Sequence, residues 1–401
     1  MNRRILLPVF LFALGAGCLV GPNYKRPAVA IPTTFRAPDP LPAGQAASLA
    51  DLKWFEVFKD DKLQALIRTA LVKNYDLRDA VLRVEEARAN LGITRSNQYP
   101  NVAANAGLDI NRLSRDGVTP IPPALLPDQN RNFGTASLEL LSFEIDIWGK
   151  LRRATEAARA NLLGAQENRK AVVTTLVGDV ATAYLTLREL DYELEISRRT
   201  LRTREESLAL TRSRQKGGVS TLLDLREAEQ LVDTAAQMIP VFEQQIEQTE
   251  NRIMLLLGEY PDSVARGRSL TEQDLPPDVP PGLTSALLER RPDIRAAEQA
   301  LIAANAQIGV AKAAYYPDVS ISGLLGGEST QLRSLFNAPH RAWTFVPQVT
   351  QPIFTAGRLK SGVQLSEVEE KRALVQYERT IQVAFSEVSD SLIAHQRVRE
   401  S

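Results

Sequence analysis

Few side chains in this chain could make or break covalent bonds. Its 401 residues include one cysteine and two histidines, and the histidines, His340 and His395, are far apart in the sequence. There is no phosphate-binding loop, no GxSxG nucleophile motif and no HExxH zinc motif, and the carboxylates are dispersed along helical stretches. A metal site or a Cys–His nucleophile pair is therefore not expected. We predict a protein that is not an enzyme, holds no cofactor and takes its energy from partners.

The single cysteine lies where a covalent lipid is expected. Arg3 and Arg4 precede an apolar run at residues 5–14, which leads through small residues to Cys18. A basic start, a short apolar run and small residues describe an export signal, too short to span a membrane as a helix. The pattern resembles a bacterial lipobox that would make Cys18 the acylated first residue of the mature chain. The chain departs from the lipobox pattern at Gly15, where leucine is more usual. The alternative to acylation is that Cys18 is a free cysteine inside an ordinary signal peptide.

A tether follows the predicted signal peptide at residues 1–17. Residues 18–58 hold six prolines between positions 22 and 42 and show little apolar periodicity, which predicts an extended segment ending in an aromatic anchor. Two or more acyl chains on Cys18 would hold the chain stably in outer-membrane lipid, whereas a single chain binds marginally. Basic and acidic residues are balanced at 48 each, so nothing in the composition indicates a nucleic-acid partner.

The chain is organised around two long heptad stretches. Residues 149–216 contain no proline, and apolar residues recur there every seven positions. The repeated residues are Val173, Val180, Leu187, Leu194, Leu201 and Leu208. At 1.5 Å per residue such a helix is roughly 100 Å long. A second heptad run follows the Gly217-Gly218 break, so we predict an antiparallel helical hairpin over 149–257 with Gly217, Gly218 and Asp224 at its tip.

Two stretches before the hairpin have the alternating pattern of strands. The pattern from Asp60 or Asp61 to Gln98 predicts one helix, and strict apolar–polar alternation then follows at residues 101–111. About ten residues is the length that a tilted strand needs to cross a bilayer. A second strand is predicted within the pair at 101–147, and its alternation changes phase between Leu140 and Leu141, which predicts a bulge or a change of environment there.

The chain then repeats itself. After a proline-rich linker at 261–282, the segment Pro292–Ala297 matches Tyr75–Ala80 at an offset of 217 positions, and Tyr316-Pro317 matches Tyr99-Pro100 at the same offset. A register without gaps over some thirty residues indicates duplication.

The duplication divides the chain into two repeats. We place the first at 59–260 and the second at 283–401, with its own strand pair at 318–354. Gly357 then corresponds to Gly149 as a strand-to-helix turn. The second repeat stops in mid-helix; judged by the first, roughly 60 to 70 residues would follow Ser401. Either a shortened gene or a fragment would account for this.

Four amphipathic strands cannot stand alone in lipid, because an open sheet leaves unpaired N–H and C=O groups at both edges. Closed membrane barrels begin at about eight strands, so copies of this chain would share one barrel. Apolar faces would contact lipid, faces rich in Asn, Ser, Thr and Gly would line a watery lumen, and the helices would prolong the tube. The alternative is a soluble helical protein with two small β-hairpins.

Several segments resemble the TolC-like outer-membrane factors, specifically the OprM/NodT-type lipoproteins of tripartite efflux systems. They are residues 18–27 (CLVGPNYKRP), 143–149, 291–295 (RPDIR), 314–318 (AYYPD) and 352–358. The resemblance implies a mainly α homotrimer with a twelve-stranded barrel and a periplasmic helical tunnel. It also implies a periplasmic adaptor, an inner-membrane transporter, and outward passage of drugs, other small molecules or metal ions. Leu19 after the cysteine agrees with sorting to the outer membrane in the family.

The resemblance carries no gating residue onto this chain. Family members narrow the periplasmic end with an aspartate at the second-repeat tip, whose counterpart here would lie beyond Ser401. Asp224 is a first-repeat tip residue, either structural or in contact with the adaptor. Two other functions remain open: the outer-membrane duct of type I protein secretion, and a lipid-anchored periplasmic coiled-coil spacer that does not conduct.

Overall fold

The structure is a computed structural model that describes residues 19–36, 53–112, 130–273 and 284–400. The chain forms two compact units. Unit 1 takes the described parts of Met1–Ala28, Glu86–Gly164 and Ala297–Arg379, and unit 2 takes those of Val29–Glu85, Ala165–Ala296 and Thr380–Ser401. Cys18 lies outside the described residues.

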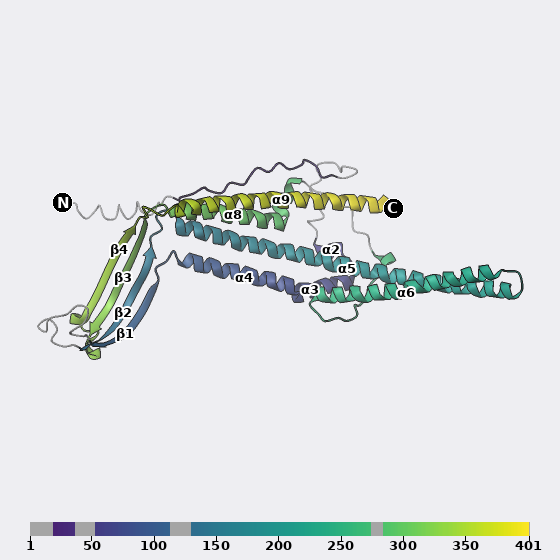
Figure 1. Ribbon diagram of the computed structural model, residues 1–401, viewed down its shortest axis with the longest axis horizontal. Coiled ribbons are helices and arrows are strands. Elements are labelled where there is room, and N and C mark those ends of the chain that lie inside the picture. Colours follow the sequence, from purple (N-terminus) through teal and green to yellow (C-terminus); the bar gives the residue numbers. More distant parts are fainter. Residues whose placement is uncertain (1–18, 37–52, 113–129, 274–283, 401) are drawn as a thin grey trace. The chain divides into compact units, whose positions relative to one another are not determined.

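Helices dominate the described chain, and four strands form one sheet (Figure 1). The α-helices are α2 (Trp54–Val57), α3 (Asp61–Lys73), α4 (Tyr75–Ser96), α5 (Lys150–Lys216), α6 (Leu222–Leu257), α7 (Thr284–Arg290), α8 (Pro292–Ala313) and α9 (Arg358–Glu400). The strands are β1 (Val102–Arg112), β2 (Asn130–Glu144), β3 (Asp318–Ser329) and β4 (Arg341–Thr350). Short 3-10 turns are η2 (Leu270–Glu272), η3 (Leu332–Ser334) and η4 (Ala338–His340). The predicted fold class, long helical hairpins with a four-stranded membrane-type sheet, is confirmed.

The order of elements is itself repeated. A helix pair, two strands and a long helix occur first as α3, α4, β1, β2 and α5, and again as α7, α8, β3, β4 and α9. The sheet order β1-β2-β3-β4 is antiparallel throughout, so it joins the strands of the two copies edge to edge. This arrangement agrees with the duplication that the sequence predicts.

The heptad seam of α5 forms the core of unit 2. Val180 and Leu187 on α5 are fully buried, and they belong to one apolar cluster with Ile253 on α6 and Ile67 on α3. Burying each such side chain contributes about 1.5 to 3 kcal/mol. One window of α5 is apolar enough to cross a membrane by composition, as core helices also are. One third of that window is buried in the described chain.

The predicted single helix from Asp60 or Asp61 to Gln98 is wrong, because the chain breaks at Asn74 between α3 and α4. The Asn74 side chain accepts a hydrogen bond from Leu77 N at 2.9 Å and caps α4. Its amide donates to the carbonyl of Leu256 at 3.0 Å, at the end of α6. The hydrogen bonds of Asn74 at the start of α4 and at the end of α6 therefore favour a break between two helices, although the apolar pattern continues on either side.

We expect Leu187→Ala to destabilise the protein by about 2 to 5 kcal/mol, because it leaves a cavity in the buried core. The midpoint of thermal unfolding, followed by circular dichroism in detergent, measures the loss. Leu210→Ala is the matched control on the same helix, since Leu210 is 54% exposed. Equal effects of the two substitutions would contradict the assignment of the seam as core.

Candidate functional site

The sheet has one apolar and one chiefly polar face across all four strands. Residues opposite each other in register point to the same side of a sheet. By this rule, the strand register places Leu108, Leu138, Leu325 and Trp343 on one face of the sheet. The apolar and small residues of that face are Val102, Ala104, Ala106, Leu108 and Ile110 on β1, Gly134, Ala136, Leu138 and Leu140 on β2, Val319, Ile321, Gly323, Leu325 and Gly327 on β3, and Trp343, Phe345, Pro347 and Val349 on β4. At the end of the strands remote from the helices the same face also carries the polar residues Arg112, Asn130, Asn132, Ser329 and Arg341. In one chain it is open: Leu108 is 66% and Trp343 74% exposed.

The opposite face carries most of the polar strand residues. They are Asn105, Asp109 and Asn111 on β1, Thr135, Ser137 and Glu139 on β2, Ser320, Ser322 and Glu328 on β3, and Thr344, Gln348 and Thr350 on β4. A sheet with one dry and one wet face can separate hydrocarbon from water.

The predicted bulge lies in β2 and keeps the faces in phase. From Leu140 to Phe143 the chain advances three residues, while its partner β3 moves only from Gly323 to Ile321. The extra residue brings Phe143, rather than Ser142, onto the apolar face opposite Ile321. The bulge is therefore confirmed, and it preserves the apolar face toward the helix end of the sheet.

Both edges of the sheet lack a partner strand among the described residues. β1 pairs only with β2, and β4 pairs only with β3. Each edge presents a row of backbone N–H and C=O groups that need hydrogen-bond partners in an apolar environment. The sheet is thus incomplete as a membrane structure.

The two predicted strand-to-helix turns occupy equivalent places. Gly149 and Gly357 come directly before α5 and α9, with φ angles of +80° and +84° that favour glycine. Asp146 caps the start of α5 by accepting hydrogen bonds from the backbone N–H groups of Leu151 and Arg152 at 3.1 and 2.9 Å. These turns aim each long helix away from the end of its strand.

The segment directly after Cys18 is fixed to the strand-to-helix junction. Val20 N donates to the carbonyl of Trp148 at 3.1 Å. Arg153, only 1% exposed, donates to the carbonyl of Val20 and to the Asn23 side chain at 3.3 and 2.7 Å. These contacts place residue 19 beside Gly149, so a lipid on Cys18 would start from a defined point.

Further along the tether, a charged contact holds it on the second repeat. Arg26 donates twice to Glu298 on α8, at 2.8 and 2.5 Å, and the Tyr24 hydroxyl donates to the same carboxylate at 3.1 Å. Burial, the Glu298 charge and this hydrogen bond all raise the pKa of Tyr24. The tether is therefore held against the second repeat here, and residues 19–36 form no helix or strand.

The hairpin tip is small and partly apolar. Gly217 and Gly218 follow α5, and Gly218 has a φ of +77°. Asp224 completes a capping box with Thr221 at the start of α6, at 2.7 and 3.1 Å. The hydrogen bond from the Thr221 N–H, with that from Ser220, lowers the pKa of Asp224. Its observed contacts are those of a helix cap.

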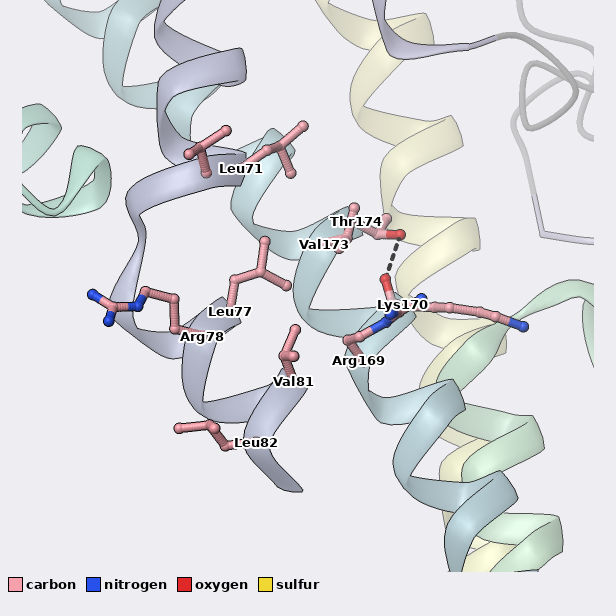
Figure 2. Close-up of a pocket in the computed structure, with 10 residues that line it drawn as sticks. Leu71, Leu77, Arg78, Val81, Leu82, Arg169, Lys170, Val173 and Thr174 are labelled. Atoms are coloured by element: carbon pink, nitrogen blue, oxygen red, sulfur yellow. Dashed lines mark hydrogen bonds between the residues drawn. The ribbon is translucent and has the colours of Figure 1, made fainter. Parts of the chain in front are cut away.

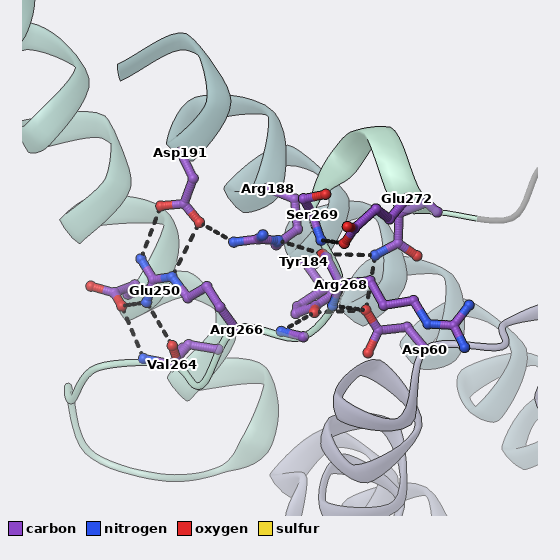
Figure 3. A network of polar contacts seen from close by, with 12 residues as sticks. Asp60, Tyr184, Arg188, Asp191, Glu250, Val264, Arg266, Arg268, Ser269 and Glu272 are labelled. Atoms are coloured by element: carbon purple, nitrogen blue, oxygen red, sulfur yellow. Dashed lines mark hydrogen bonds and ion pairs between the residues drawn. The ribbon is translucent and has the colours of Figure 1, made fainter. Parts of the chain in front are cut away.

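A buried carboxylate ties the chain after α6 to the helices, and sequence reasoning did not single it out (Figure 3). Asp60 is 3% exposed and accepts hydrogen bonds from Tyr184, Gln273 and the backbone N–H of Arg268 at 3.0, 2.9 and 3.2 Å. Burial opposes its ionisation, but the hydrogen bonds from Gln273, Leu63, Tyr184 and Lys62 outweigh burial and lower its pKa. Burial also raises the pKa of Tyr184 to about 12.

A second ion cluster lies beside it. Arg266 donates to Asp191 on α5 at 3.2 Å and pairs with Glu250 on α6. Asp191 also accepts from Arg188 at 2.6 Å, as Figure 3 shows. The first part of the predicted linker is thereby bound to the hairpin; residues 274–283 lie outside the described part.

An open groove lies between α4 and α5 in unit 2 (Figure 2). Its volume is about 700 Å³. Leu77, Val81 and Val173 give it an apolar lining, and Arg78 and Arg169 add positive charge. It suits an apolar surface better than a small polar ligand. Within the described ranges, no group of three or more His, Cys, Asp or Glu is placed to hold a metal ion.

We expect Asp60→Asn to lower stability at pH 7 by about 1 to 3 kcal/mol, because hydrogen bonds to a charged group are among the strong ones. The lowered folded pKa means that ionised Asp60 stabilises the fold above its ordinary value of 3.8, and that this stability is lost as the pH falls through the folded pKa. The difference between wild type and variant in thermal midpoint should therefore shrink below about pH 4.

The neighbouring Asp61→Asn is the control for this prediction, since Asp61 is exposed. It should change the midpoint little at either pH. A constant difference between wild type and Asp60→Asn from pH 7 to pH 3 would show that the charge of Asp60 is not the stabilising feature.

Comparison with known proteins adds independent information. A family model described as outer membrane efflux protein matches residues 66–259 and 283–401. The cation efflux system protein CusC of Escherichia coli K12 is 34% identical over 402 aligned residues, covering 100% of this chain and 85% of CusC. The probable outer membrane lipoprotein SilC of Salmonella typhimurium is 35% identical, covering 98% of this chain and 83% of SilC.

A solved structure agrees with the fold. The open state of the MtrE outer membrane channel of Neisseria gonorrhoeae superposes with a TM-score of 0.84 at 32% identity. The match covers 96% of this chain and 83% of MtrE. Likeness in both sequence and fold therefore extends over nearly the whole chain.

Proposed function

The chain belongs to the outer membrane efflux protein family and is an outer-membrane efflux component, and from that premise we propose how it works. It is the passive exit duct of a tripartite efflux system. A periplasmic adaptor and an inner-membrane transporter complete that system and supply its energy, and the duct itself performs no enzymatic step.

The observation that carries the proposal is the open, two-faced sheet. In the part of the chain that the structure describes, four strands with two unpaired edges cannot close on themselves, and barrels need about eight. Three copies give twelve strands when β4 of each copy pairs with β1 of the next. This homotrimer gives every edge strand a partner strand without adding any other chain.

The orientation of the faces follows from the solvent on each side. The face with Leu108, Leu138, Leu325 and Trp343 contacts lipid, and the opposite face, rich in hydroxyl, amide and carboxylate groups, lines a water-filled lumen. Small polar molecules and ions would pass such a lumen. The cargo class is small molecules, either drugs or metal ions, and the name of CusC as a cation efflux protein supports the second.

Cys18 carries the lipid anchor in this proposal. The name of SilC as a probable lipoprotein supports it, as does the fixed path of the next residues along Trp148 and Arg153. Anchoring at this point would put the acyl chains beside the helix end of the sheet, at the periplasmic leaflet.

The hairpin tip is the surface proposed for the adaptor. Val219, Leu222 and Leu223 are 81%, 60% and 66% exposed there, an apolar group that solvent alone does not explain. Gly217 and Gly218 keep the tip narrow, and Asp224 holds the first turn of α6 in place. The tip thus offers a compact apolar contact with a fixed shape.

The test of the duct is assembly and conductance. We expect the purified protein in detergent to be a trimer by native mass spectrometry, and to give discrete single-channel currents in planar bilayers. Arg341→Pro at the first residue of β4, and Val346→Pro in the middle of the same edge, make a matched pair. The second should lower trimer yield more than the first, because proline removes a donor and is poorly tolerated within a paired strand.

A monomer without currents would rule out the duct. A trimer that never conducts would support a spacer instead. Currents that open only with an unfolded polypeptide would favour protein secretion.

Cys18→Ser should abolish acylation while leaving trimer formation intact, because the sheet and hairpin do not depend on the lipid. Intact-mass spectrometry of protein extracted from membranes measures the acyl mass, and an inhibitor of the lipoprotein signal peptidase should have the same effect on the unaltered chain. A wild-type mature chain without acyl mass, cleaved elsewhere, would contradict the anchor.

A further inference from the structure

The loop between β3 and β4 folds back onto the apolar face of the sheet. Leu335 is 6% exposed, and its carbonyl oxygen lies against Gly327, where a Cβ would clash with it. A Cβ on Gly134 would meet the Leu332 side chain at 2.9 Å. Gly134 and Gly327 both belong to the apolar face by register. The loop therefore lies over the same face that is proposed to contact lipid.

A hollow of about 750 Å³ lies between this loop and the sheet. On the sheet side its lining includes the small residues Ala104, Ala106 and Ala136 of the apolar face. On the loop side it is lined by Leu335 and Phe336, with Arg341 at the start of β4. Because these side chains are small, the surface of the sheet is hollowed there between larger apolar neighbours.

The hollow crosses the sheet obliquely. Ala104 and Ala106 lie in the half of β1 nearer the helices, whereas Leu335, Phe336 and Arg341 lie at the end of the sheet that is remote from the helices. Helices α4, α5, α8 and α9 join the strands at the end marked by Val102, Glu144, Asp318 and Thr350, whereas the β3–β4 loop joins Ser329 to Arg341 at the other end (Figure 1). With the helices in the periplasm, as the proposed function requires, the end of the hollow with Arg341 faces the outer leaflet, and its alanine-lined part extends inward from there.

The side chains around the hollow combine aromatic and cationic groups. Phe336, Trp343 and Phe345 are 76%, 74% and 59% exposed, a composition typical of a membrane interface. Arg341 is exposed. The nearest carboxylate on β3 is that of Glu328, and the strand register places it on the opposite face of the sheet. A positive charge beside a dry hollow complements a phosphate attached to acyl chains.

We propose that this hollow docks a phosphorylated, multiply acylated glycolipid of the outer leaflet. One acyl chain lies against Ala104, Ala106 and Ala136, and a headgroup phosphate contacts the Arg341 guanidinium. The inference rests on the proposed function, because that function sets which leaflet the hollow faces. It assigns to the recessed part of the lipid face a specific ligand rather than bulk lipid.

The experiment titrates the purified full-length protein in detergent with purified lipid A, and counts bound lipid by native mass spectrometry. Phosphatidylethanolamine is the zwitterionic comparison lipid. We expect the wild type to retain lipid A at concentrations where phosphatidylethanolamine is lost. Arg341→Glu should weaken lipid A binding at least tenfold, and Ala106→Leu, which fills the hollow without changing charge, should weaken it similarly. Arg202→Glu, an exposed site on α5, is the matched charge-reversal control and should bind as wild type does.

Equal lipid A binding by wild type and both hollow variants would overturn the inference, and so would equal retention of the two lipids by wild type. The inference would also be overturned if the assemblies paired with each other and a second copy of the protein filled the hollow. Bilayer currents of each variant are recorded in parallel. If the hollow variants give normal currents and bind lipid A as wild type does, this inference alone is wrong. If the wild type gives no currents, the proposed duct is wrong, and the titration still decides whether the hollow binds lipid A.

Discussion

The structure depends on one constraint: a backbone N–H or C=O that enters hydrocarbon must bring its hydrogen-bond partner with it. Each unsatisfied group costs several kcal/mol in lipid. Among the residues that the structure describes, the sheet satisfies its inner strands and leaves one row of backbone groups open on β1 and another on β4. The missing partners have to be supplied by other copies, so the smallest stable membrane form is larger than one chain.

The bulge in β2 and the two glycine turns keep the sheet compatible with that constraint. A strand that slipped by one residue would turn its apolar side chains toward water. The bulge between Leu140 and Phe143 prevents this where β2 approaches the helices. The two glycine turns at Gly149 and Gly357 then let each strand end and a long helix begin within a few residues. The change from strand to helix is therefore abrupt in both repeats.

Periodic features of this molecule could be predicted from the sequence, and pairwise polar contacts could not. Heptads predicted α5 and α6, alternation predicted β1 and β2, and the internal repeat predicted β3 and β4. The phase change after Leu140 indicated a bulge or a change of environment, and the structure has the bulge. Asn74, Asp60 and Arg153 carried no such signal. Each acts through a partner that is distant in the sequence, such as Leu256, Tyr184 or Val20, and a single polar residue does not reveal which distant group it will meet. The exposure of the tip residues and the hollow on the sheet likewise required coordinates.

The contact between the tether and the second repeat has a consequence for symmetry. Glu298, which receives Arg26 and Tyr24, corresponds at the offset of 217 to Val81, which lines the open groove of the first repeat. Gene duplication made two similar halves, but a chain has only one beginning, so only one half could acquire a carboxylate to hold it. A ring of three such chains would present six helical sectors of two alternating kinds.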